Sequence, residues 1–203
     1  MVSAPSGAGK TTLCKRLLQD LPGLAFSVSL TTRPARDGER EGVDYYFVDP
    51  AEFDRRRQRG DLIEWAVVDG QLYGTSAAAV QEATARGIDV LLDIDTLGAA
   101  SIRTKNPEAI LIFIMPPGTE ALKERLARRG TEDPGALARR LSLARGEVEK
   151  WPLYDYVVVN EDLETAYDQL RSIVVAARCG RERQAERLRA LAAGFGAERG
   201  AGS

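Results

Sequence analysis

The sequence predicts an α/β fold of three layers built around a parallel central sheet. Segments with strand-like and helical patterns alternate along most of the chain, and this order is typical of parallel sheets. Two apolar runs, 88–94 and 109–115, are rich in β-branched residues and almost uninterrupted, as strands buried on both faces are. A glycine-rich loop near the N-terminus precedes the first helical pattern, which is a further feature of such folds.

The other elements follow from apolar spacing and from glycine and proline. A helix is predicted over 11–20, where leucines recur at helical spacing before a Pro-Gly break. Strands are predicted at 26–30, 44–48, 62–68 and 156–159, and helices at 120–129, 136–150 and 163–178. The strand that enters the first loop contains only Met1 and Val2, whereas strands usually have about five or six residues. We expect a chain that starts there to lose hydrogen-bond pairing of this central strand and to melt at a lower temperature.

These elements divide the chain into a core and an insertion. Residues 1–30 and 88–178 are predicted to form the core, and the polar, tyrosine-rich stretch 31–87 an inserted subdomain. The segment at about 128–140 has the polar, glycine-containing composition of a small lid. For the tail, 179–203, we expect a loosely docked helix followed by a disordered end.

Composition limits the class of protein. Apolar residues make up 44% and charged residues 29%, the balance of a soluble globular protein. A net charge of −2 gives no bulk attraction to nucleic acid or to membranes, so we expect neither as a partner, and phosphate binding must use locally placed cations. Without a bilayer-spanning apolar run or a visible signal peptide, a cytoplasmic location is expected.

The chain contains no histidine, which removes the commonest general base and the commonest transition-metal ligand. A hydrolase with a Ser-His-Asp triad is therefore excluded. Cys14 and Cys179 lie far apart without CxxC spacing, and we expect two free thiols.

The strongest motif is the run 4–12, which closely matches the phosphate-binding pattern G-x-x-x-x-G-K-[ST], with Ala4 in place of the first glycine. Small residues let the backbone wrap a phosphate, and the helix that follows adds the positive end of its dipole. Lys10 supplies a cation for the β- and γ-phosphates, and the Thr11 hydroxyl is a ligand for Mg²⁺. The alternative is a turn that only joins a strand to a helix. The predicted ATP-binding residues are Ala4, Pro5, Ser6, Gly7, Ala8, Gly9, Lys10, Thr11 and Thr12.

Further short motifs follow the cradle in this order: Ser-Leu-Thr-Thr-Arg-Pro-Ala-Arg (29–36), Asp-Tyr-Tyr-Phe (44–47), Ile-Glu-Trp (63–65), Tyr-Gly-Thr (73–75), Leu-Asp-Ile-Asp (92–95) and Arg-Gly-Thr-Glu (129–132). Together with the cradle, this ordered set resembles the motifs of guanylate kinases. The resemblance extends from the first residue to about Arg178. It implies a P-loop NTPase fold in which 31–87 is a GMP-binding subdomain and 128–140 a lid. It also implies transfer of the γ-phosphoryl group of ATP to GMP with Mg²⁺ as cofactor.

The resemblance implies that Arg33, Arg36, Tyr45 and Tyr73 hold the GMP phosphate. Guanidinium forks bind a phosphate bidentately, and phenol hydroxyls are additional donors. The alternative for the two arginines is a pair of solvated surface charges.

The resemblance assigns the reading of guanine to Glu64, assisted by Ser29, Thr75 and Asp95. Guanine presents N1–H and an N2 amino group as neighbouring donors, and a carboxylate, which only accepts, matches this pair and rejects adenine. The alternative is that Glu64 is an exposed strand carboxylate beside Trp65.

The remaining predicted residues concern phosphoryl transfer. Asp93 and Asp95 end a buried strand, where ligands bind in open α/β folds, and Asp93 is the candidate to orient magnesium-bound water. Arg129 and Arg140 match the lid arginines of similar enzymes. Together with Lys10 and Arg33 they complete the predicted catalytic set.

Two other functions fit parts of the sequence. A non-catalytic guanylate kinase-like scaffold module tends to lack a working cradle, whereas Lys10 and Thr11 are present here. A related P-loop kinase acting on a phosphorylated sugar would suit the Thr-Thr-Arg-Pro segment, but Glu64, Thr75 and Asp95 together favour guanine. The oligomeric state is left open.

Overall fold

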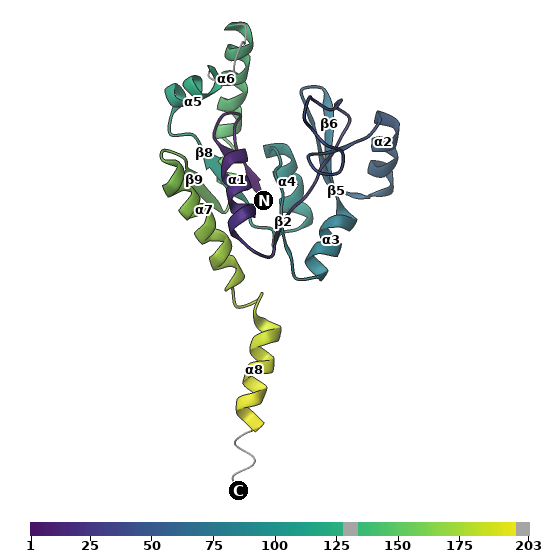
Figure 1. Cartoon of the computed structure of the whole chain (residues 1–203), viewed down its shortest axis with the longest axis vertical. Helices are drawn as coiled ribbons and strands as arrows, with labels where there is room; N and C mark the ends of the chain where they lie inside the picture. The colour runs from purple at the N-terminus through teal and green to yellow at the C-terminus, as the bar shows by residue number, and fades with distance from the viewer. Residues whose placement is uncertain (128–133, 198–203) are drawn as a thin grey trace.

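The main sheet of this computed structural model, which describes residues 1–127 and 134–197, is parallel (Figure 1). A bridge between Val2 and Asp93 joins the β2–β7 pair to the β1–β8–β9 group, and the Val2 N–H donates to the Leu92 carbonyl at 2.9 Å. The strands, in spatial order, are β2 (Leu24–Phe26), β7 (Asp89–Leu91), β1 (Val2–Ser3), β8 (Ile112–Met115) and β9 (Tyr156–Val159).

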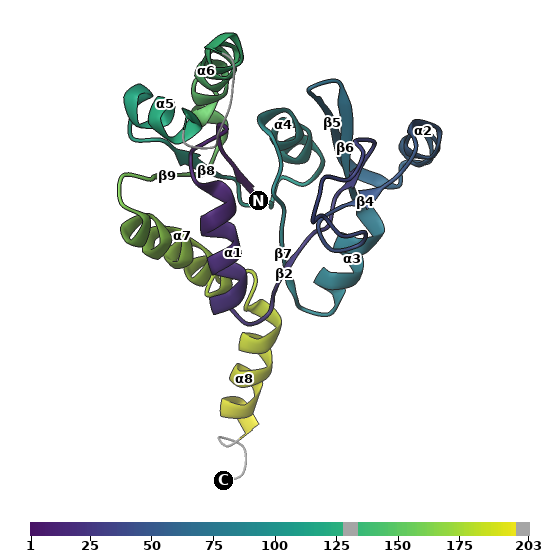
Figure 2. The same ribbon diagram turned by 45° about the horizontal axis from the view of Figure 1, so that its top comes forward.

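Helices cover both faces of this sheet. They are α1 (Lys10–Asp20), α4 (Thr96–Lys105), α5 (Thr119–Ala127), α6 (Pro134–Val148) and α7 (Leu163–Arg178), with a short 3₁₀ helix at Trp151–Leu153. Figure 2 shows α1 and α7 side by side, and α4 apart from them across the sheet.

Alternation along β8 explains the layers. Ile112 and Ile114 belong to a buried cluster with leucines of α1 and α7, whereas Leu111 and Phe113 belong to a second cluster with Ala99 of α4. Successive side chains of a strand point to opposite faces, so an uninterrupted apolar run must be covered on both sides. The predicted three-layer α/β fold with a parallel sheet is therefore confirmed.

A second, smaller sheet stands beside the first. In spatial order it contains β4 (Tyr46–Phe47), β3 (Leu30–Thr31), β6 (Gln71–Ser76) and β5 (Leu62–Val68), and the helices α2 (Pro50–Arg59) and α3 (Ala77–Ala85) accompany it. Its core contains Leu30, Phe53 and Leu62, all buried. The Asp49 side chain caps α2 by accepting from the Glu52 N–H at 2.8 Å.

The predicted strand at 26–30 is wrong as a single element. The chain leaves the main sheet after Phe26 and joins the second sheet at Leu30, so the apolar alternation runs through the crossing between two sheets. Within the crossing, the Ser27 N–H donates to the Leu91 carbonyl at 3.0 Å, and the Ser29 carbonyl accepts from the Tyr46 N–H at 2.9 Å. Each end of the crossing is thus held by a different sheet.

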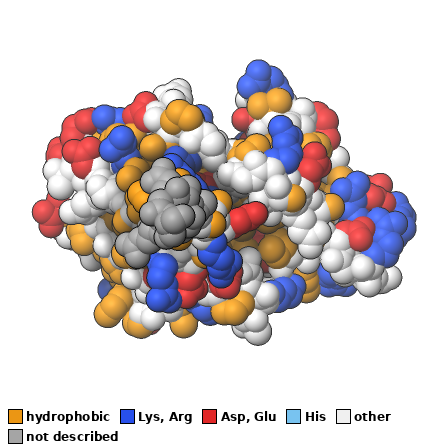
Figure 3. Space-filling model, turned by 90° about the horizontal axis from the view of Figure 1, so that it is seen from below, with side chains coloured by type: hydrophobic (Ala, Val, Ile, Leu, Met, Phe, Trp, Pro, Cys, Tyr) orange, Lys and Arg blue, Asp and Glu red, His pale blue; other side chains and the backbone are white. Residues whose placement is uncertain are grey.

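The C-terminal helix α8 (Ala185–Ala197) extends away from the rest of the molecule in Figure 1. It is tied at its start, where Gln184 Nε2 donates to the Arg178 carbonyl and Arg178 Nε donates to Asp89 Oδ2 at 2.7 Å. Farther along, Leu191 and Phe195 are exposed. Figure 3, a view from below, shows basic and acidic side chains interspersed over that face. No helix within the described ranges has the length and apolarity needed to cross a membrane.

Candidate active site

The loop between β1 and α1 is curled by two glycines. Gly7 and Gly9 have φ values of +87° and +97°, which glycine adopts without strain. The Ala8 N–H donates to the Pro5 carbonyl at 3.1 Å, and Gly9 precedes the first turn of α1, so the unpaired N–H groups of the helix open at the loop. A β-carbon on Gly9 would collide with the Asn160 side chain. The backbone therefore offers its N–H groups as an anion cradle.

The other predicted cradle residues are divided between core and surface. Ala4 and Ala8 are buried, which explains why small residues stand there. Ser6, Thr11 and Thr12 are exposed at the loop and at the start of α1. A hydroxyl at Thr11 is thus accessible to a ligand of the cradle.

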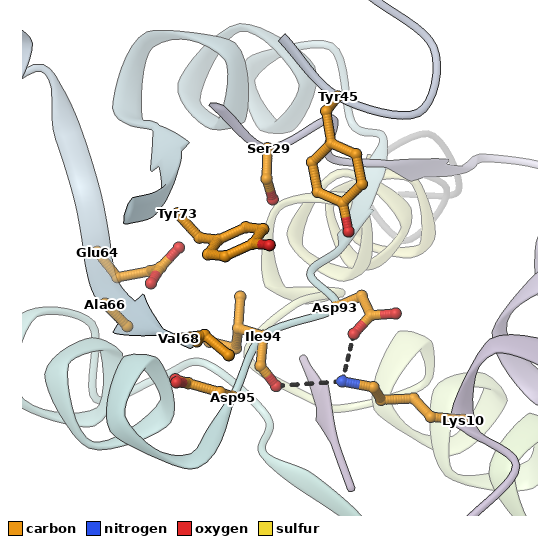
Figure 4. A pocket seen from close by; sticks show the side chains of 10 residues that line it. All are labelled: Lys10, Ser29, Tyr45, Glu64, Ala66, Val68, Tyr73, Asp93, Ile94 and Asp95. Carbon is orange, nitrogen blue, oxygen red and sulfur yellow. Dashed lines mark hydrogen bonds and ion pairs between the residues drawn. The ribbon is translucent and has the colours of Figure 1, made fainter. Parts of the chain in front are cut away.

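Lys10 is the first residue of α1, and its side chain reaches the residues that follow β7. Its ammonium group forms an ion pair with the Asp93 carboxylate and donates to the Ile94 carbonyl at 3.4 Å. About a fifth of the Lys10 side chain is exposed, so the cation is accessible from the cavity described below. Figure 4 draws this pair on one side of the cavity.

Two residues that the sequence analysis did not single out hold the cradle. Asn160, which follows β9 and is buried, donates from Nδ2 to the Ala8 carbonyl at 2.7 Å. Arg125 of α5 donates to the Asn160 carbonyl at 2.9 Å and to the Ala8 carbonyl at 3.5 Å. Asn160 directly follows an apolar strand pattern, as Asp93 does, and this was the available signal. Its partner is 152 residues away in sequence.

A third residue without a sequence prediction is Glu147 of α6. Its pKa is raised, mainly because burial disfavours the charged carboxylate, while the Lys10 charge and the Ser6 N–H oppose the shift. This carboxylate therefore stands near the cradle.

A cavity of about 250 Å³ opens beside the cradle, between the main sheet and the second sheet (Figure 4). Figure 4 shows Lys10 and Asp93 on one side of it and Glu64 with Asp95 on the other. Its lining residues are Lys10, Ser29, Tyr45, Glu64, Ala66, Val68, Tyr73, Asp93, Ile94 and Asp95. Seven of them carry a predicted role.

Glu64 is a buried carboxylate, only 3% exposed, at the wall of this cavity. It pairs with Thr75 across β5 and β6, and the Thr75 hydroxyl donates to Glu64 Oε1 at 2.6 Å. Burial raises the pKa of Glu64 to about 7, and the Thr75 hydrogen bond opposes that shift. The alternative of an exposed strand carboxylate is thereby excluded, and Thr75 contacts Glu64 rather than lining the cavity itself.

The side chains of Glu39 and Tyr73 hold Arg33. Its Nη2 donates to both oxygens of Glu39 at 2.8 and 3.0 Å, and its Nε donates to the Tyr73 hydroxyl at 3.3 Å. The Glu39 hydrogen bond is the main reason that the pKa of Arg33 is raised. Glu39 also accepts from the Arg36 N–H at 2.8 Å. Glu39 had no predicted role, although it follows the arginine motif closely.

Tyr45 and Ser29 line the cavity, whereas Arg36 does not. The Tyr45 ring packs edge-on against Tyr73 at 5.9 Å and lies 5.4 Å from the Arg33 guanidinium carbon. Burial raises the pKa of Tyr45, so its hydroxyl remains a donor at neutral pH. The Arg36 side chain is exposed in the same loop as Arg33.

Asp95 caps the helix α4. Its Oδ1 accepts from the Gly98 N–H at 2.7 Å, and the carboxylate also lines the cavity. The residue therefore has a structural role in addition to its place in the cavity wall.

The lid residues are only partly described. Arg140 lies on α6 and is exposed. Arg129, the other predicted lid arginine, lies outside the described residues.

Comparisons with known proteins identify the family. The family model described as Guanylate kinase matches residues 1–177. The guanylate kinase of Symbiobacterium thermophilum is 50% identical over 176 residues, which cover 87% of this chain and 83% of the relative. The guanylate kinase of Myxococcus xanthus is 50% identical over 184 residues, with 90% and 88% covered. A crystal structure of guanylate kinase from Anaplasma phagocytophilum matches with a TM-score of 0.71 at 38% identity, covering 87% of this chain and 84% of that one. The chain therefore belongs to the guanylate kinase family.

Proposed function

We propose that this chain transfers the γ-phosphoryl group of ATP to GMP, giving ADP and GDP, and that the residues around the cavity perform the reaction. Membership of the guanylate kinase family supports the reaction. The observation that carries the residue assignment is that the buried Glu64 and the Lys10 cation line one cavity. A base-reading group and a phosphate-binding group thus face the same space.

The donor phosphates bind at the cradle. The N–H groups of the loop and of the first turn of α1 accept the negative charge, and the Lys10 ammonium compensates charge on the β- and γ-phosphates. Lys10 exchanges its Asp93 partner for phosphate oxygens, because a dianionic group at the cradle attracts it more strongly than one carboxylate does.

The guanine base binds at Glu64. The ionised carboxylate accepts from N1–H and from the N2 amino group, and Thr75 holds it in place. Adenine presents an acceptor at N1, so this buried carboxylate would face it without the N1–H donor that guanine supplies, at a large cost in free energy.

The GMP phosphate binds near Arg33, Tyr45 and Tyr73. Tyr45 and Tyr73 line the cavity, and Arg33, which does not line it, donates from Nε to the Tyr73 hydroxyl. Glu39 holds the Arg33 guanidinium in place. Arg36 adds a cation from the same loop when its exposed side chain turns toward the phosphate. Ser29 and Asp95 complete the cavity wall near the nucleoside.

Mg²⁺ fits the donor chemistry of this site. A magnesium ion bound with a nucleotide takes one or two protein oxygens, with phosphate oxygens and waters as its other ligands. The Thr11 hydroxyl would be a direct ligand, and Asp93 would hold a magnesium-bound water. Within the described residues no group of three or more acidic, Cys or His side chains gathers as a metal site, which suits an ion that arrives with ATP. The ion would neutralise phosphate charge.

The transfer itself requires positioning more than covalent chemistry by the protein. An oxygen of the GMP phosphate forms a bond to the γ-phosphorus, and the bond from that phosphorus to the β–γ bridging oxygen breaks, so ADP leaves with the electron pair. The attacking phosphate oxygen is already ionised at neutral pH, so no general base is needed. Arg140 and Arg129 of the lid are proposed to compensate charge on the transferring group.

The direct test is a coupled assay of ADP release with ATP and magnesium, offering GMP, AMP, UMP and ribose bisphosphate separately. We expect turnover with GMP alone among these acceptors. Binding of GMP without turnover would favour a non-catalytic module instead, and turnover with ribose bisphosphate would favour a sugar kinase.

A further inference from the structure

A glycine stands inside α4 at the point where the helix is closest to Glu64. Gly98 is buried, and its N–H is already used by the Asp95 cap at 2.7 Å. Glycine is among the least favourable residues inside a helix, because it loses more backbone freedom than any other residue. Its presence at this position therefore calls for a local reason.

The reason lies in the space beside its α-carbon. A β-carbon on Gly98 would lie 2.6 Å from Glu64 Oε2, and 3.4 Å from both Glu64 Cδ and Asp95 Oδ1. The first distance is shorter than any ordinary contact of a methyl group with oxygen, so one of the two partners would have to move.

The helix is the part that cannot move easily. The neighbouring Ala99 and Ile102 are almost completely buried in the two clusters that join α4 to the main sheet. The Glu64 carboxylate, by contrast, is the far end of a flexible side chain, and Thr75 is the residue that donates a hydrogen bond to it. An added methyl group would displace the carboxylate and leave the fold in place.

We propose that Gly98 is a specificity-determining residue of the base site: its missing side chain leaves the space in which the Glu64 carboxylate stands to meet the donor edge of guanine. This inference rests on the proposed role of Glu64. Gly98 does not touch the nucleotide in this proposal, and it acts by setting the position of the group that does.

The test compares Gly98→Ala with Gly146→Ala, a matched change inside another helix. A β-carbon on Gly146 would meet open space, so this control adds the same methyl group and the same helix propensity without a collision. We expect Gly98→Ala to raise KM for GMP at least tenfold and to leave KM for ATP and kcat at saturating GMP within about twofold. The control should change none of these values.

A double-mutant cycle with Glu64→Ala separates a route through Glu64 from a general structural effect. Glu64→Ala removes the oxygen that the new methyl group would meet, so Gly98→Ala should have no further effect on KM for GMP in that background. An equal loss in both backgrounds, or an unchanged KM in the single variant, would overturn the role of Gly98.

The cycle also distinguishes failure of the inference from failure of the proposed function. If Glu64→Ala itself leaves the preference for GMP over AMP intact, the assignment of Glu64 is wrong. If that variant loses the preference and Gly98→Ala does not alter KM, only the role of Gly98 is wrong. Should Gly98→Ala fail to fold, folding of the double variant would support the collision with Glu64, and failure of both would contradict it.

Discussion

The Thr75 hydroxyl donates a hydrogen bond of 2.6 Å to Glu64 Oε1 inside the wall of the cavity. The two residues face each other on β5 and β6, so the bond is set by strand register rather than by a flexible loop. Because the bond favours the ionised carboxylate while burial disfavours it, Thr75 controls how much of Glu64 is charged near neutral pH.

Thr75→Val should therefore weaken the binding of GMP by raising the pKa of Glu64. Loss of the donor raises that pKa further, so we expect KM for GMP to increase about tenfold at pH 7 and less at pH 8.5. Thr75→Ser retains the hydroxyl and should stay near the original value. Steady-state kinetics over this pH range would contradict the prediction if the loss were the same at every pH.

Glu64→Gln should stabilise the protein free of nucleotide at alkaline pH. The folded pKa of about 7 lies above the ordinary value of 4.5, so the folded state binds more protons between these values and its free energy of unfolding falls as pH rises through them. Glutamine removes this loss, and we expect its advantage to grow by about 2 kcal/mol from pH 5 to pH 8. Denaturant titrations of both proteins measure this difference in the free energy of unfolding. A difference that does not change with pH would refute a pKa of about 7 for Glu64 in the folded state.

Glu39→Gln should weaken the binding of GMP and leave the binding of ATP unchanged. The amide has one acceptor oxygen in place of the two that Arg33 Nη2 contacts, and it lacks the negative charge, so the guanidinium is held less firmly. We expect a rise in KM for GMP of about fivefold to twentyfold, on the scale of one hydrogen bond to a charged group. Asp37→Asn, an exposed change in the same loop, is the control. A loss in the control as large as that in Glu39→Gln would point to general charge instead.

Asn160→Asp should weaken the binding of ATP rather than that of GMP. It replaces the N–H donor to the Ala8 carbonyl by an oxygen that repels it, and so it disturbs the cradle from outside. KM for ATP is expected to rise about tenfold or more, with KM for GMP unchanged. Glu161→Gln, the exposed neighbour, should be silent. If KM rose equally for ATP and GMP, Asn160 would be important for the fold rather than for the cradle.

Lys10→Ala should reduce kcat by about a hundredfold or more, because charge on the transferring group loses its cation. Lys15→Ala, an exposed change on the same helix, should leave kcat unaltered. Circular dichroism and thermal melting establish that the variant is folded. A folded Lys10→Ala protein with near-normal turnover would exclude Lys10 from the mechanism.

The sequence predicts elements best where their pattern is uninterrupted. The helix Leu163–Arg178 and the strands Leu62–Val68 and Tyr156–Val159 are confirmed at both ends. The helix α2 was not predicted because Phe53 is its one buried residue, which leaves no apolar period to detect. The helix α4 contains a glycine and β-branched residues, which weaken its helical signal.

For the site, short motifs locate most of the side chains around the cavity, but not the residues that hold them. Glu39 and Asn160 act on Arg33 and on the Ala8 carbonyl, and such partnerships depend on how distant segments meet. The raised pKa of Glu64 likewise depends on burial between β5 and α4, which no local pattern encodes.

The loop at Gly7 and Gly9 offers mostly main-chain N–H groups to the donor, whereas the wall at Glu64 offers side chains to the acceptor. A binding surface of main-chain groups changes little when side chains are substituted, whereas a surface of side chains changes with each substitution. Evolution or design should therefore find new acceptors for this scaffold far more readily than new ways of holding the donor.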